Sequence, residues 1–465
     1  MMEAQRLLLQ SSQVLLLLPT VCLAAAYPDH FNYKYASYLT CQQKYIVNSN
    51  SRGGANTSSP IFVYTGDKAW IDGVAISAGF IIDLASRFRG LLLYIEHRYY
   101  GDSMAFGYKQ IAGQNASTLG FFSASQALAD YAELIIELKR NLSEENCPVI
   151  AIGGSYGGML ASWFRLKYPH LPLVPWHHLL QFSTLTKFLL KMAIMWLLQG
   201  ILDENCYNTI RLSWFEIDKV AVQPNGLMNL RNIFNSCMPL YSSEELKSYL
   251  GFVYVFSARS DNPPYNSVSD ACNAIDGAPA GTDILGKVVR GFNASFFGSG
   301  GSCNNVIEIK PNNGSGWFWQ TCTEIVMPIG HGENVTMFQA SPFDLENYTR
   351  TCLEIFGVSP RPHWIITEFG GHDIKYVLGN FASNIIFSNG LRNPWSAGGV
   401  LQNISDSVVA VYTKEGAHCL DLSNPSSSDP DWLVAQRDKE INIIGSWSED
   451  YKVKLGSKAG KKIHF

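Results

Sequence analysis

The most constraining feature of the sequence is a serine in a glycine-rich turn between a predicted strand and a predicted helix. The turn has the pattern Gly153-x-Ser155-x-Gly157 and follows the apolar run 149–152 directly. Such a run is typical of a strand buried on both faces of a sheet, and a helical pattern continues as far as Tyr168. Only glycine tolerates the close backbone approach in so sharp a turn, which exposes the serine hydroxyl above the sheet. The pattern predicts a nucleophile at Ser155.

A serine nucleophile also needs hydrogen-bond donors for the oxyanion that forms when it attacks a carbonyl group. The backbone N–H of Tyr156, at the start of the predicted helix, can be one donor. We expect the loop after the apolar run 61–64 to supply the second donor, and we assign it to Gly66. These groups are therefore predicted to lie together at one edge of a sheet.

The base of such a site follows the last strand of the sheet, and the acid follows the strand before it. The run 407–412 predicts the last strand, and it leads to His418, which we expect to be the base. The strand predicted at 384–387 leads to Asn393, where an aspartate is expected. The predicted triad is thus Ser155, His418 and Asn393, with an amide in place of a carboxylate.

Two aspartates elsewhere in the chain could substitute for the missing carboxylate. Asp421 lies three residues after His418, and Asp373 precedes the strand that should carry the acid. Neither follows that strand, so Asn393 remains the preferred assignment.

The arrangement of apolar runs predicts the class of fold. Runs at 61–64, 91–95 and 149–152 predict strands, and 123–141 has apolar residues at helical spacing. Strands that alternate with helices at both ends of the chain predict an α/β sheet. The region of about 190–360 is richer in Cys, Asn and Gly and has few strong strand patterns, which indicates a long insertion.

Composition and charge limit the partners of the chain. With 47% hydrophobic and 12% aromatic residues it can bury a large core, which excludes a disordered protein. The net charge is −4 and no block of Lys and Arg occurs, which argues against a nucleic-acid partner. No Cys-x-x-Cys pair is present, so we do not expect a zinc site, and a mechanism built on a serine and a histidine implies no cofactor.

The N-terminus and the glycosylation signals indicate the secretory pathway. Residues 1–26 read as a signal peptide, with Arg6 before the apolar segment 14–18 and small residues at 24–26. We expect the mature protein in a lysosome or vacuole or outside the cell. Eight Asn-x-Ser/Thr sequons support this expectation. They are Asn56, Asn115, Asn141, Asn293, Asn313, Asn334, Asn347 and Asn403.

The cysteines also suit an oxidising compartment, because nine of the ten lie outside the signal peptide. Eight of these nine could form four disulfides, with the pairing left open, and Cys419 would then remain a free thiol. The eight are Cys41, Cys147, Cys206, Cys237, Cys272, Cys303, Cys322 and Cys352.

Four segments, in this order along the chain, closely resemble the S28 family of serine peptidases, and the resemblance extends from about residue 60 to 451. The segments are Glu-His-Arg-Tyr-Tyr-Gly-Asp-Ser at 96–103, Gly-Gly-Ser-Tyr-Gly-Gly-Met-Leu-Ala at 153–161, Trp-Gln-Thr-Cys-Thr-Glu at 319–324 and Phe-Ser-Asn-Gly at 387–390.

The resemblance implies an α/β-hydrolase fold with an inserted helical lid. The hydrolase domain would comprise 27–190 and 361–465, and the lid 191–360. It also implies a peptide substrate with proline near a terminus, with Ser155 as nucleophile and His418 as base. The pattern is closest to members of the Pro-X carboxypeptidase type, but the motifs do not separate carboxypeptidases from aminopeptidases. A homodimer is left open.

The sequence departs from the family pattern at three places. The family aspartate is replaced by Asn393, and the second histidine of an Ala-His-His motif by Cys419. After His170 a small-residue strand of the family is absent, so we expect the sheet to lack a strand beside the serine turn. An apolar run to Leu202 follows, and its two lysines favour a lid helix over a membrane span.

Two further groups of residues have open interpretations. Trp317, Trp319 and Trp395 either line an apolar pocket for proline or pack the lid against the core. The segment Glu96-His97-Arg98 ends a predicted strand, where a structural ion pair is preferred over a catalytic role.

The sequence therefore predicts a serine exopeptidase that cleaves peptides next to proline and is impaired by Asn393. The alternative is a catalytically inactive homologue that binds peptides or proteins through the same cleft. An esterase on the same serine turn has no support beyond the Gly-x-Ser-x-Gly pattern.

Overall fold

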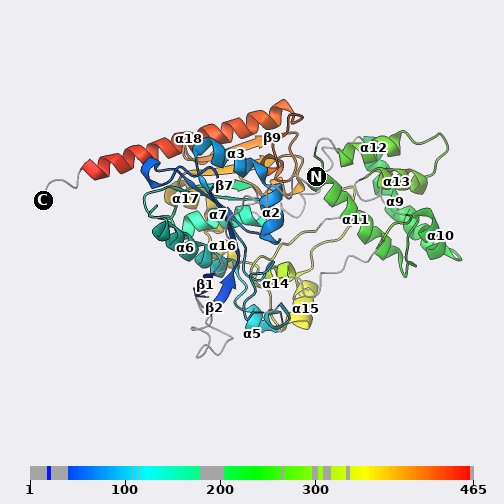
Figure 1. Ribbon diagram of the computed structural model, residues 1–465. Coiled ribbons are helices and arrows are strands. Elements are labelled where there is room, and N and C mark those ends of the chain that lie inside the picture. The colour runs from blue at the N-terminus through cyan, green and yellow to red at the C-terminus, as the bar shows by residue number, and fades with distance from the viewer. Residues whose placement is uncertain are drawn as a thin grey trace.

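The computed structural model consists of a lobe built around a sheet and a separate lobe of helices, which lie next to each other in Figure 1. The helical lobe, drawn mainly in green, is formed by residues between 204 and 294. The structure describes residues 18–21, 40–107, 109–113, 115–178, 204–262, 266–295, 302–306, 316–330 and 336–460.

A sheet of seven strands forms the centre of the first lobe. Its first strand is antiparallel to its neighbour, and every other neighbouring pair is parallel. Parallel strands of this kind are joined by helical crossovers that cover both faces of the sheet. This topology, with a long insertion before the last two strands, confirms the predicted α/β-hydrolase fold. The order across the sheet is β3 (Tyr45–Asn48), β5 (Leu91–Ile95), β4 (Ile61–Thr65), β6 (Val149–Gly153), β7 (Pro172–His178), β8 (Ile385–Gly390) and β9 (Val408–Thr413).

Helices pack on both faces of this sheet, which explains why most positions of its central strands are apolar. On one face α6 (Ala124–Asn141) and α7 (Tyr156–Lys167) share a core with Val63 of β4. On the other face α3 (Gly79–Phe88) and α18 (Asp431–Gly460) share a core with the residues on either side of Val63. Because the turn after β6 starts α7, this packing fixes the position of the predicted nucleophile.

The prediction that a strand beside the serine turn is missing is wrong. Residues Pro172–His178 form β7, which pairs in parallel with β6 on one side and with β8 on the other. The register shifts once, between Val149 and Ile150. The unusual residues after His170 therefore still complete the sheet, because backbone groups make the ladder. The apolar run that follows, predicted as a lid helix, lies outside the described residues.

The helical lobe has a hydrophobic core of its own. Its helices bury apolar side chains such as Leu250, Val288 and Phe292 against one another. These helices lie within the segment that the sequence assigns to a lid, and their role as a lid stays a prediction. The helices are α9 (Glu204–Ala221), α10 (Gly226–Ile233), α11 (Ser243–Arg259), α12 (Ser267–Asp276) and α13 (Ile284–Ala294).

The remaining elements are short. They are β1 (Leu18–Val21), β2 (Thr40–Gln43), η2 (Ala55–Thr57), α2 (Ile71–Ser77), α4 (Lys109–Ala112), α5 (Ala116–Leu119), α14 (Gly316–Thr323), α15 (Leu345–Phe356), α16 (Trp364–Glu368), η4 (Gly371–Asp373), α17 (Ile374–Phe381), η5 (Pro394–Gly398) and η6 (Leu420–Leu422).

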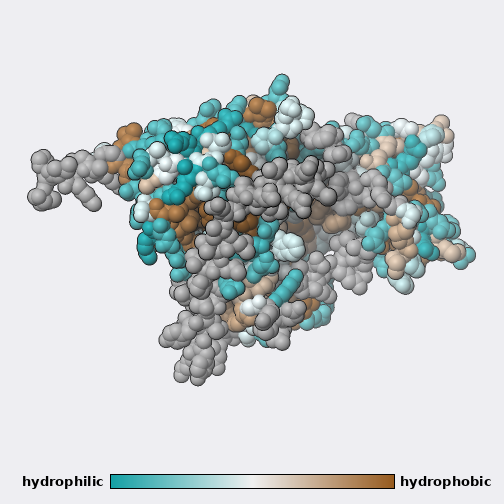
Figure 2. Space-filling model, in the orientation of Figure 1, coloured by the Kyte–Doolittle hydropathy of each residue, from teal (hydrophilic) through white to brown (hydrophobic). Residues whose placement is uncertain are grey.

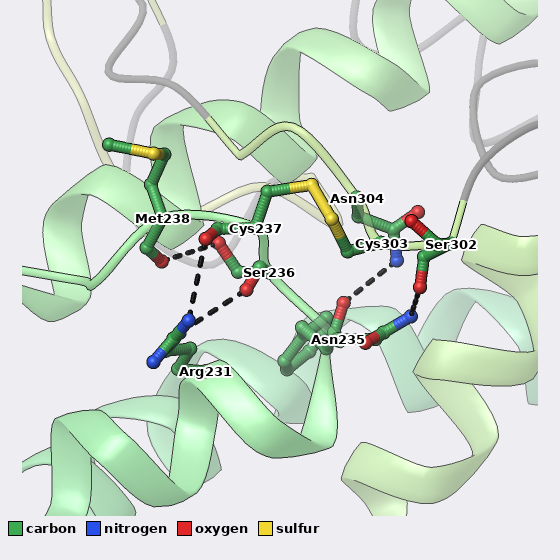
Figure 3. The surroundings of a disulfide bond; sticks show 9 residues. Arg231, Asn235, Ser236, Cys237, Met238, Ser302, Cys303 and Asn304 are labelled. Atoms are coloured by element: carbon green, nitrogen blue, oxygen red, sulfur yellow. Dashed lines mark hydrogen bonds between the residues drawn. A yellow bond between two sulfur atoms is a disulfide. The ribbon is translucent and has the colours of Figure 1, made fainter.

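Three disulfides join described residues, all of them in the insertion between β7 and β8: Cys206–Cys272, Cys237–Cys303 and Cys322–Cys352. Figure 3 shows the second, where the Asn235 side chain donates to the carbonyl oxygen of Ser302 at 3.0 Å. Bonds of this kind hold the segment 302–306 against the end of α10, where little regular structure would otherwise fix it.

The predicted scheme of four disulfides is wrong for Cys147. This residue is a free thiol, buried at the start of β6 among apolar side chains of the sheet core. Burial raises the pKa of the Cys147 thiol to about 11, so the side chain behaves as a small apolar group. Cys419 is free, as expected, although it is a partly buried residue rather than an exposed one.

The N-terminal residues and the exposed sequons are relevant to the cellular compartment expected for the protein. Leu18–Val21 pair with Thr40–Gln43 as an antiparallel ribbon, and the rest of the predicted signal peptide lies outside the described residues. Of the eight sequons, the six that fall on described residues are all exposed. None of the helices described combines the length and apolar content of a membrane span. Exposed sequons and disulfides indicate an oxidising compartment.

The outer surface of the helical lobe contains several exposed apolar side chains. Figure 2 shows tan patches among teal ones on this lobe. The exposed apolar residues include Phe215 on α9, Val222 just after α9 and Met228 on α10. Single exposed apolar residues are common on proteins and identify no partner. The homodimer therefore stays a prediction.

Candidate active site

The turn between β6 and α7 has the backbone that the Gly-x-Ser-x-Gly pattern predicts. Ser155 has φ 53° and ψ −126°, a strained conformation for a residue with a side chain. A Cβ on Gly153 would lie 2.3 Å from the backbone of Gly157, and one on Gly157 would lie 2.5 Å from the carbonyl oxygen of Thr65. Both glycines are required here because the turn packs directly against the end of β4.

His418 lies in the loop after β9 and lines the same cavity as Ser155. Its backbone N–H donates to the carbonyl oxygen of Arg259 at 3.2 Å, which ties the loop to the C-terminal end of α11. The structure thus brings the predicted nucleophile and the predicted base together, and the helical lobe takes part in placing the base.

Asn393 lies beside the imidazole of His418, at the end of the loop after β8. Its side chain is fully buried, and its Oδ1 lies 3.3 Å from Nδ1 of His418. The same Oδ1 accepts the backbone N–H of Trp395 at 3.3 Å. With Nδ1 carrying the proton that Oδ1 accepts, Nε2 is left as the basic nitrogen of the ring. Among the described residues, no group bonds to Nδ2 of Asn393.

Of the two backbone N–H groups predicted to bind the oxyanion, that of Tyr156 is suitably placed and that of Gly66 is already hydrogen-bonded. Tyr156 is the first residue of α7, so its backbone N–H lies at the positive end of that helix. The N–H of Gly66 instead donates to the carbonyl oxygen of Ile95 at 2.9 Å. The prediction for Gly66 is therefore wrong, because the ladder between β4 and β5 continues through it. The next residue, Asp67, lies against the start of α7, since a Cβ on Gly157 would approach its Cβ to 3.4 Å.

The cavity beside Ser155 and His418 has a volume of about 390 Å³ and mainly apolar walls. Trp317 and Trp395 both line it, which is one of the two alternatives that the sequence left open for them. The ring of Trp317 also packs at 5.3 Å from the ring of Tyr156. The cavity is lined by Lys68, Ser155, Tyr156, Met159, Val255, Phe256, Arg259, Trp317, Met327, Trp395 and His418.

Trp319 does not line this cavity, and its assignment to the pocket is wrong. It is a buried residue whose indole N–H donates to the carbonyl oxygen of Phe122 at 3.1 Å. Its ring packs edge-on against Phe356 at 5.4 Å. The reason is helical geometry, since residues two apart on α14 point to different sides. Trp317 faces the cavity while Trp319 packs the protein core.

Sequence reasoning assigned no role to Lys68, Arg259, Met159 or Met327, although all four line the cavity. Met159 is one turn after the nucleophile on α7, a position that a helical pattern could have indicated. Arg259 ends α11 and Met327 follows α14, both in the insertion far from the other site residues in sequence. Only the folded chain places these two at the site.

The two alternative acids have other roles. The carboxylate of Asp421 accepts from the hydroxyl of Ser388 at 2.7 Å, within a buried polar cluster that includes Glu440. Burial and the charge of Asp421 raise the pKa of Glu440. Asp373 is an exposed residue that caps α17 by accepting the backbone N–H of Tyr376 at 3.1 Å.

The Glu96-His97-Arg98 segment is structural, as expected. Arg98 forms a buried ion pair with Asp130, and Nε2 of His97 lies 3.1 Å from the hydroxyl of Tyr156. Burial lowers the pKa of His97 to about 3, so its ring is neutral. These contacts hold the ring of Tyr156, and with it the start of α7, against the core.

Cys419, which replaces a family histidine, lies directly beneath the serine turn. Its Sγ would be 3.2 Å from a Cβ on Gly154, and it accepts a hydrogen bond from the backbone of Ser155. Burial raises the pKa of the Cys419 thiol to about 12, so it is protonated and unreactive.

The sheet topology, the strained serine turn and the adjacent histidine together define an α/β-hydrolase with a serine at the nucleophile position. Within that class, the family model described as serine carboxypeptidase S28 matches residues 27–440. The chain belongs to this family of serine peptidases, and the resemblance seen in the motifs is confirmed.

Several known proteins are similar over most of the chain. The mouse lysosomal Pro-X carboxypeptidase is 35% identical over 461 residues, covering 91% of this chain and 88% of that protein. The mouse thymus-specific serine protease is 26% identical, covering 89% and 85%. Among solved structures, a proline iminopeptidase from Mycobacterium smegmatis matches with a TM-score of 0.38 at 10% identity, covering 89% of this chain and 97% of that one.

Proposed function

We propose that the protein is a serine exopeptidase that cleaves peptides at proline and that Asn393 limits its turnover. The observation that carries the proposal is the cavity itself, in which Ser155 and His418 share walls with Trp317 and Trp395. Flat aromatic rings and the flexible side chain of Met159 suit the rigid apolar ring of proline.

The residues would act in the order of ordinary acyl transfer. Nε2 of His418 accepts the proton of Ser155 as its oxygen attacks the carbonyl carbon. The N–H of Tyr156 stabilises the resulting oxyanion, and we assign the second donor to the backbone N–H of Asp67 in place of Gly66. His418 then returns the proton to the leaving amine, and water hydrolyses the acyl-enzyme.

Asn393 would orient the imidazole of His418 as an aspartate does, but it would not stabilise the charged form of the ring. Its Oδ1 orients the ring of His418 and selects the tautomer that carries a proton on Nδ1. It supplies no negative charge to stabilise the imidazolium that forms when Ser155 loses its proton. We therefore expect weak activity rather than altered substrate binding.

A catalytically inactive peptide-binding protein is the rival proposal. The uncharged Asn393 and its buried Nδ2, which no described residue bonds, favour this alternative. A lysosome, a vacuole or the extracellular space is the proposed location in both cases, on the basis of the exposed sequons and of the lysosomal relatives.

A fluorophosphonate probe separates the two proposals, because it reacts only with an activated serine. We expect slow labelling of the purified protein and none of Ser155→Ala. Ser162→Ala is the matched control, since Ser162 is a buried serine of the same helix that donates to the carbonyl oxygen of Met159. A wild-type protein that takes up no probe at saturating time would establish the inactive homologue.

A further inference from the structure

Segment 319–324, one of the four that resemble the S28 family, places two buried polar side chains next to the serine turn. Gln320 lies on α14 and Glu324 directly follows this helix, and at most 1% of either residue is exposed. Neither is among the described residues that line the cavity with Ser155. Burying an amide and a carboxyl group is unfavourable unless hydrogen bonds satisfy them, so their partners indicate what they hold in place.

The side chain that Gln320 holds is that of Tyr156, the first residue of α7. Nε2 of Gln320 donates to the hydroxyl oxygen of Tyr156 at 2.7 Å and to Oε1 of Glu324 at 3.0 Å. Oε1 of Gln320 accepts the hydroxyl of Tyr100 at 2.7 Å. Oε1 of Glu324 also accepts the backbone N–H of Ala124 at 2.9 Å. The amide of Gln320 is therefore bonded at both of its ends, which fixes the direction in which it donates to Tyr156.

His97 is the second partner of the Tyr156 hydroxyl. Nδ1 of His97 lies 2.6 Å from the carbonyl oxygen of Arg98, which can only accept, so Nδ1 carries the ring proton. Burial lowers the pKa of His97 to about 3, so the ring is neutral and its Nε2 is an acceptor. The hydroxyl of Tyr156 therefore donates to Nε2, 3.1 Å away, while its oxygen accepts from Gln320. These two bonds leave the hydroxyl a single orientation.

Helix α14 contacts the ring of Tyr156 as well as its hydroxyl. The rings of Trp317 and Tyr156 lie 5.3 Å apart between their centres. Trp317 and Gln320 are three residues apart on α14, so they face the same side of this helix. The disulfide Cys322–Cys352 ties α14 to α15. Tyr156 is thus held at both ends of its side chain by a helix that is itself cross-linked.

The backbone at Tyr156 needs support from outside α7. The peptide between Ser155 and Tyr156 carries the N–H assigned to the oxyanion, and the first N–H groups of a helix have no acceptor within it. Ser155, with φ 53° and ψ −126°, has a strained backbone that persists only where its surroundings impose it. On the strand side the hydroxyl of Thr65 donates to the carbonyl oxygen of Gly157 at 2.7 Å. On the helix side the support comes from the side chain of Tyr156.

We propose that Gln320 and Glu324 are positioning residues of the active site, which fix Tyr156 so that its backbone N–H stays directed at the oxyanion. The inference rests on the proposed function, because the oxyanion forms only in that reaction. Gln320 acts on Tyr156 directly, and Glu324 acts through Gln320 by accepting from its amide. Loss of this support weakens the binding of the transition state more than the binding of the uncleaved peptide.

Calorimetric titration with two ligands tests the inference without requiring turnover. N-acetyl-alanyl-boroproline imitates the transition state, because the oxygen of Ser155 adds to its boron and the serine proton passes to His418. The boron keeps both hydroxyl groups and becomes an anion, with one of these oxygens in the place of the oxyanion. N-acetyl-alanyl-pyrrolidine has the same ring without the boron and reports the binding of the uncleaved peptide. We expect the wild type to bind the boronate at least about tenfold more tightly than the pyrrolidine.

The variants Gln320→Met and Tyr156→Phe remove the bond between the two side chains from either end. Each should weaken the binding of the boronate by about five- to fiftyfold and change that of the pyrrolidine by less than about twofold. The double variant should lose no more than the larger of the two single losses, because both substitutions break one interaction. Tyr156→Phe removes a single oxygen atom, so it provides the comparison if Gln320→Met does not fold.

Glu324→Gln separates positioning from simple packing. Oε1 of an amide can accept the same two N–H groups, and among the described residues nothing bonds to Oε2 of Glu324. We therefore expect Glu324→Gln to keep the affinity for the boronate within about twofold, and Glu324→Met to weaken it by about three- to thirtyfold. Thr323→Ala is the matched control on α14, since its hydroxyl donates only to the carbonyl oxygen of Trp319, at 2.9 Å. It should bind both ligands as the wild type does.

The outcomes separate the inference from the proposed function. A folded Gln320→Met that binds the boronate as tightly as the wild type overturns the inference, and so does an equal loss for both ligands. Losses that multiply in the double variant also overturn it. A wild type that binds the boronate no more tightly than the pyrrolidine, or binds neither, contradicts the proposed function and the inference with it.

Discussion

Asn393 differs from an aspartate in charge, but it keeps the atom that matters for orientation. The sequence leaves open whether its amide presents a donor to His418, and the structure places Oδ1 toward Nδ1 at 3.3 Å. The ring is therefore held in the tautomer that a base requires. What is missing is the negative charge that stabilises the imidazolium. In the Ser-His-Asp triad of a serine protease the replacement of the aspartate by asparagine, with the wrong tautomer that results, lowers kcat by about a factor of 10⁴.

Gly157 offers a residue-scale test of the serine turn. Gly157→Ala would place a Cβ 2.5 Å from the carbonyl oxygen of Thr65, a backbone atom that cannot move away cheaply. We expect a loss of about 1–3 kcal/mol in the free energy of unfolding, together with reduced probe labelling of Ser155.

Gly73→Ala is the matched control, because a Cβ on this exposed glycine of α2 meets no atom within 4 Å. Its stability should be unchanged or raised by up to about 1 kcal/mol. If both variants melt at the wild-type temperature in a calorimetric scan, the close packing of the turn on β4 is refuted.

At the scale of elements, the sequence predicted the strands that have a clear apolar pattern. It missed a strand whose formation depends on tertiary contacts with its neighbours. The strands at β4, β5, β6, β8 and β9 have apolar patterns that a sheet buried on both faces requires. β7 was missed because its residues look unlike a strand, although the gap between β6 and β8 accepts any extended segment. Local propensity was overridden there by the pairing that its neighbours offer.

The residues of the candidate site likewise include some that the sequence could predict and some that it could not. Ser155, His418 and Asn393 each follow a strand, so their place in the sequence predicts their place at the sheet edge. The assignments of Gly66 and Trp319 were wrong by one or two positions. The sequence does not show exactly where a strand ends or which side of a short helix faces the cavity. The sequence could not show that Lys68 and Arg259 line one cavity, because a helix of the insertion brings the second one there.

At the scale of the whole molecule, buried carboxyl groups make stability depend on pH. Burial raises the pKa of Glu324 to about 7 from its ordinary value near 4.5, and it raises the pKa of Glu440 as well. A carboxyl group whose pKa is higher in the folded state stabilises the fold below its unfolded pKa. That contribution is lost as the pH rises through the folded pKa.

We therefore expect Glu324 to remove on the order of 3 kcal/mol of stability as the pH rises from about 4.5 to about 7.5, so that the wild type loses stability relative to Glu324→Gln over this range. His97, whose pKa burial lowers to about 3, acts in the opposite direction below about pH 6.5 and contributes equally to both proteins. Glu324→Gln should flatten this dependence, because its amide oxygen can still accept the N–H of Ala124 that Glu324 accepts at 2.9 Å. Differential scanning calorimetry measures both. The same pH dependence of the melting temperature in both proteins would contradict the assignment.

The central claim is that Asn393 limits an otherwise complete catalytic site, and restoring the acid tests it most directly. The measurement is kcat on a peptide with proline before its last residue, for the wild type and for Asn393→Asp. Asn389→Asp is the control, because it adds a carboxylate at another buried position of β8 and its loop. We predict that Asn393→Asp raises kcat by at least about a hundredfold and that Asn389→Asp does not. A folded Asn393→Asp whose kcat equals that of the wild type would contradict the account.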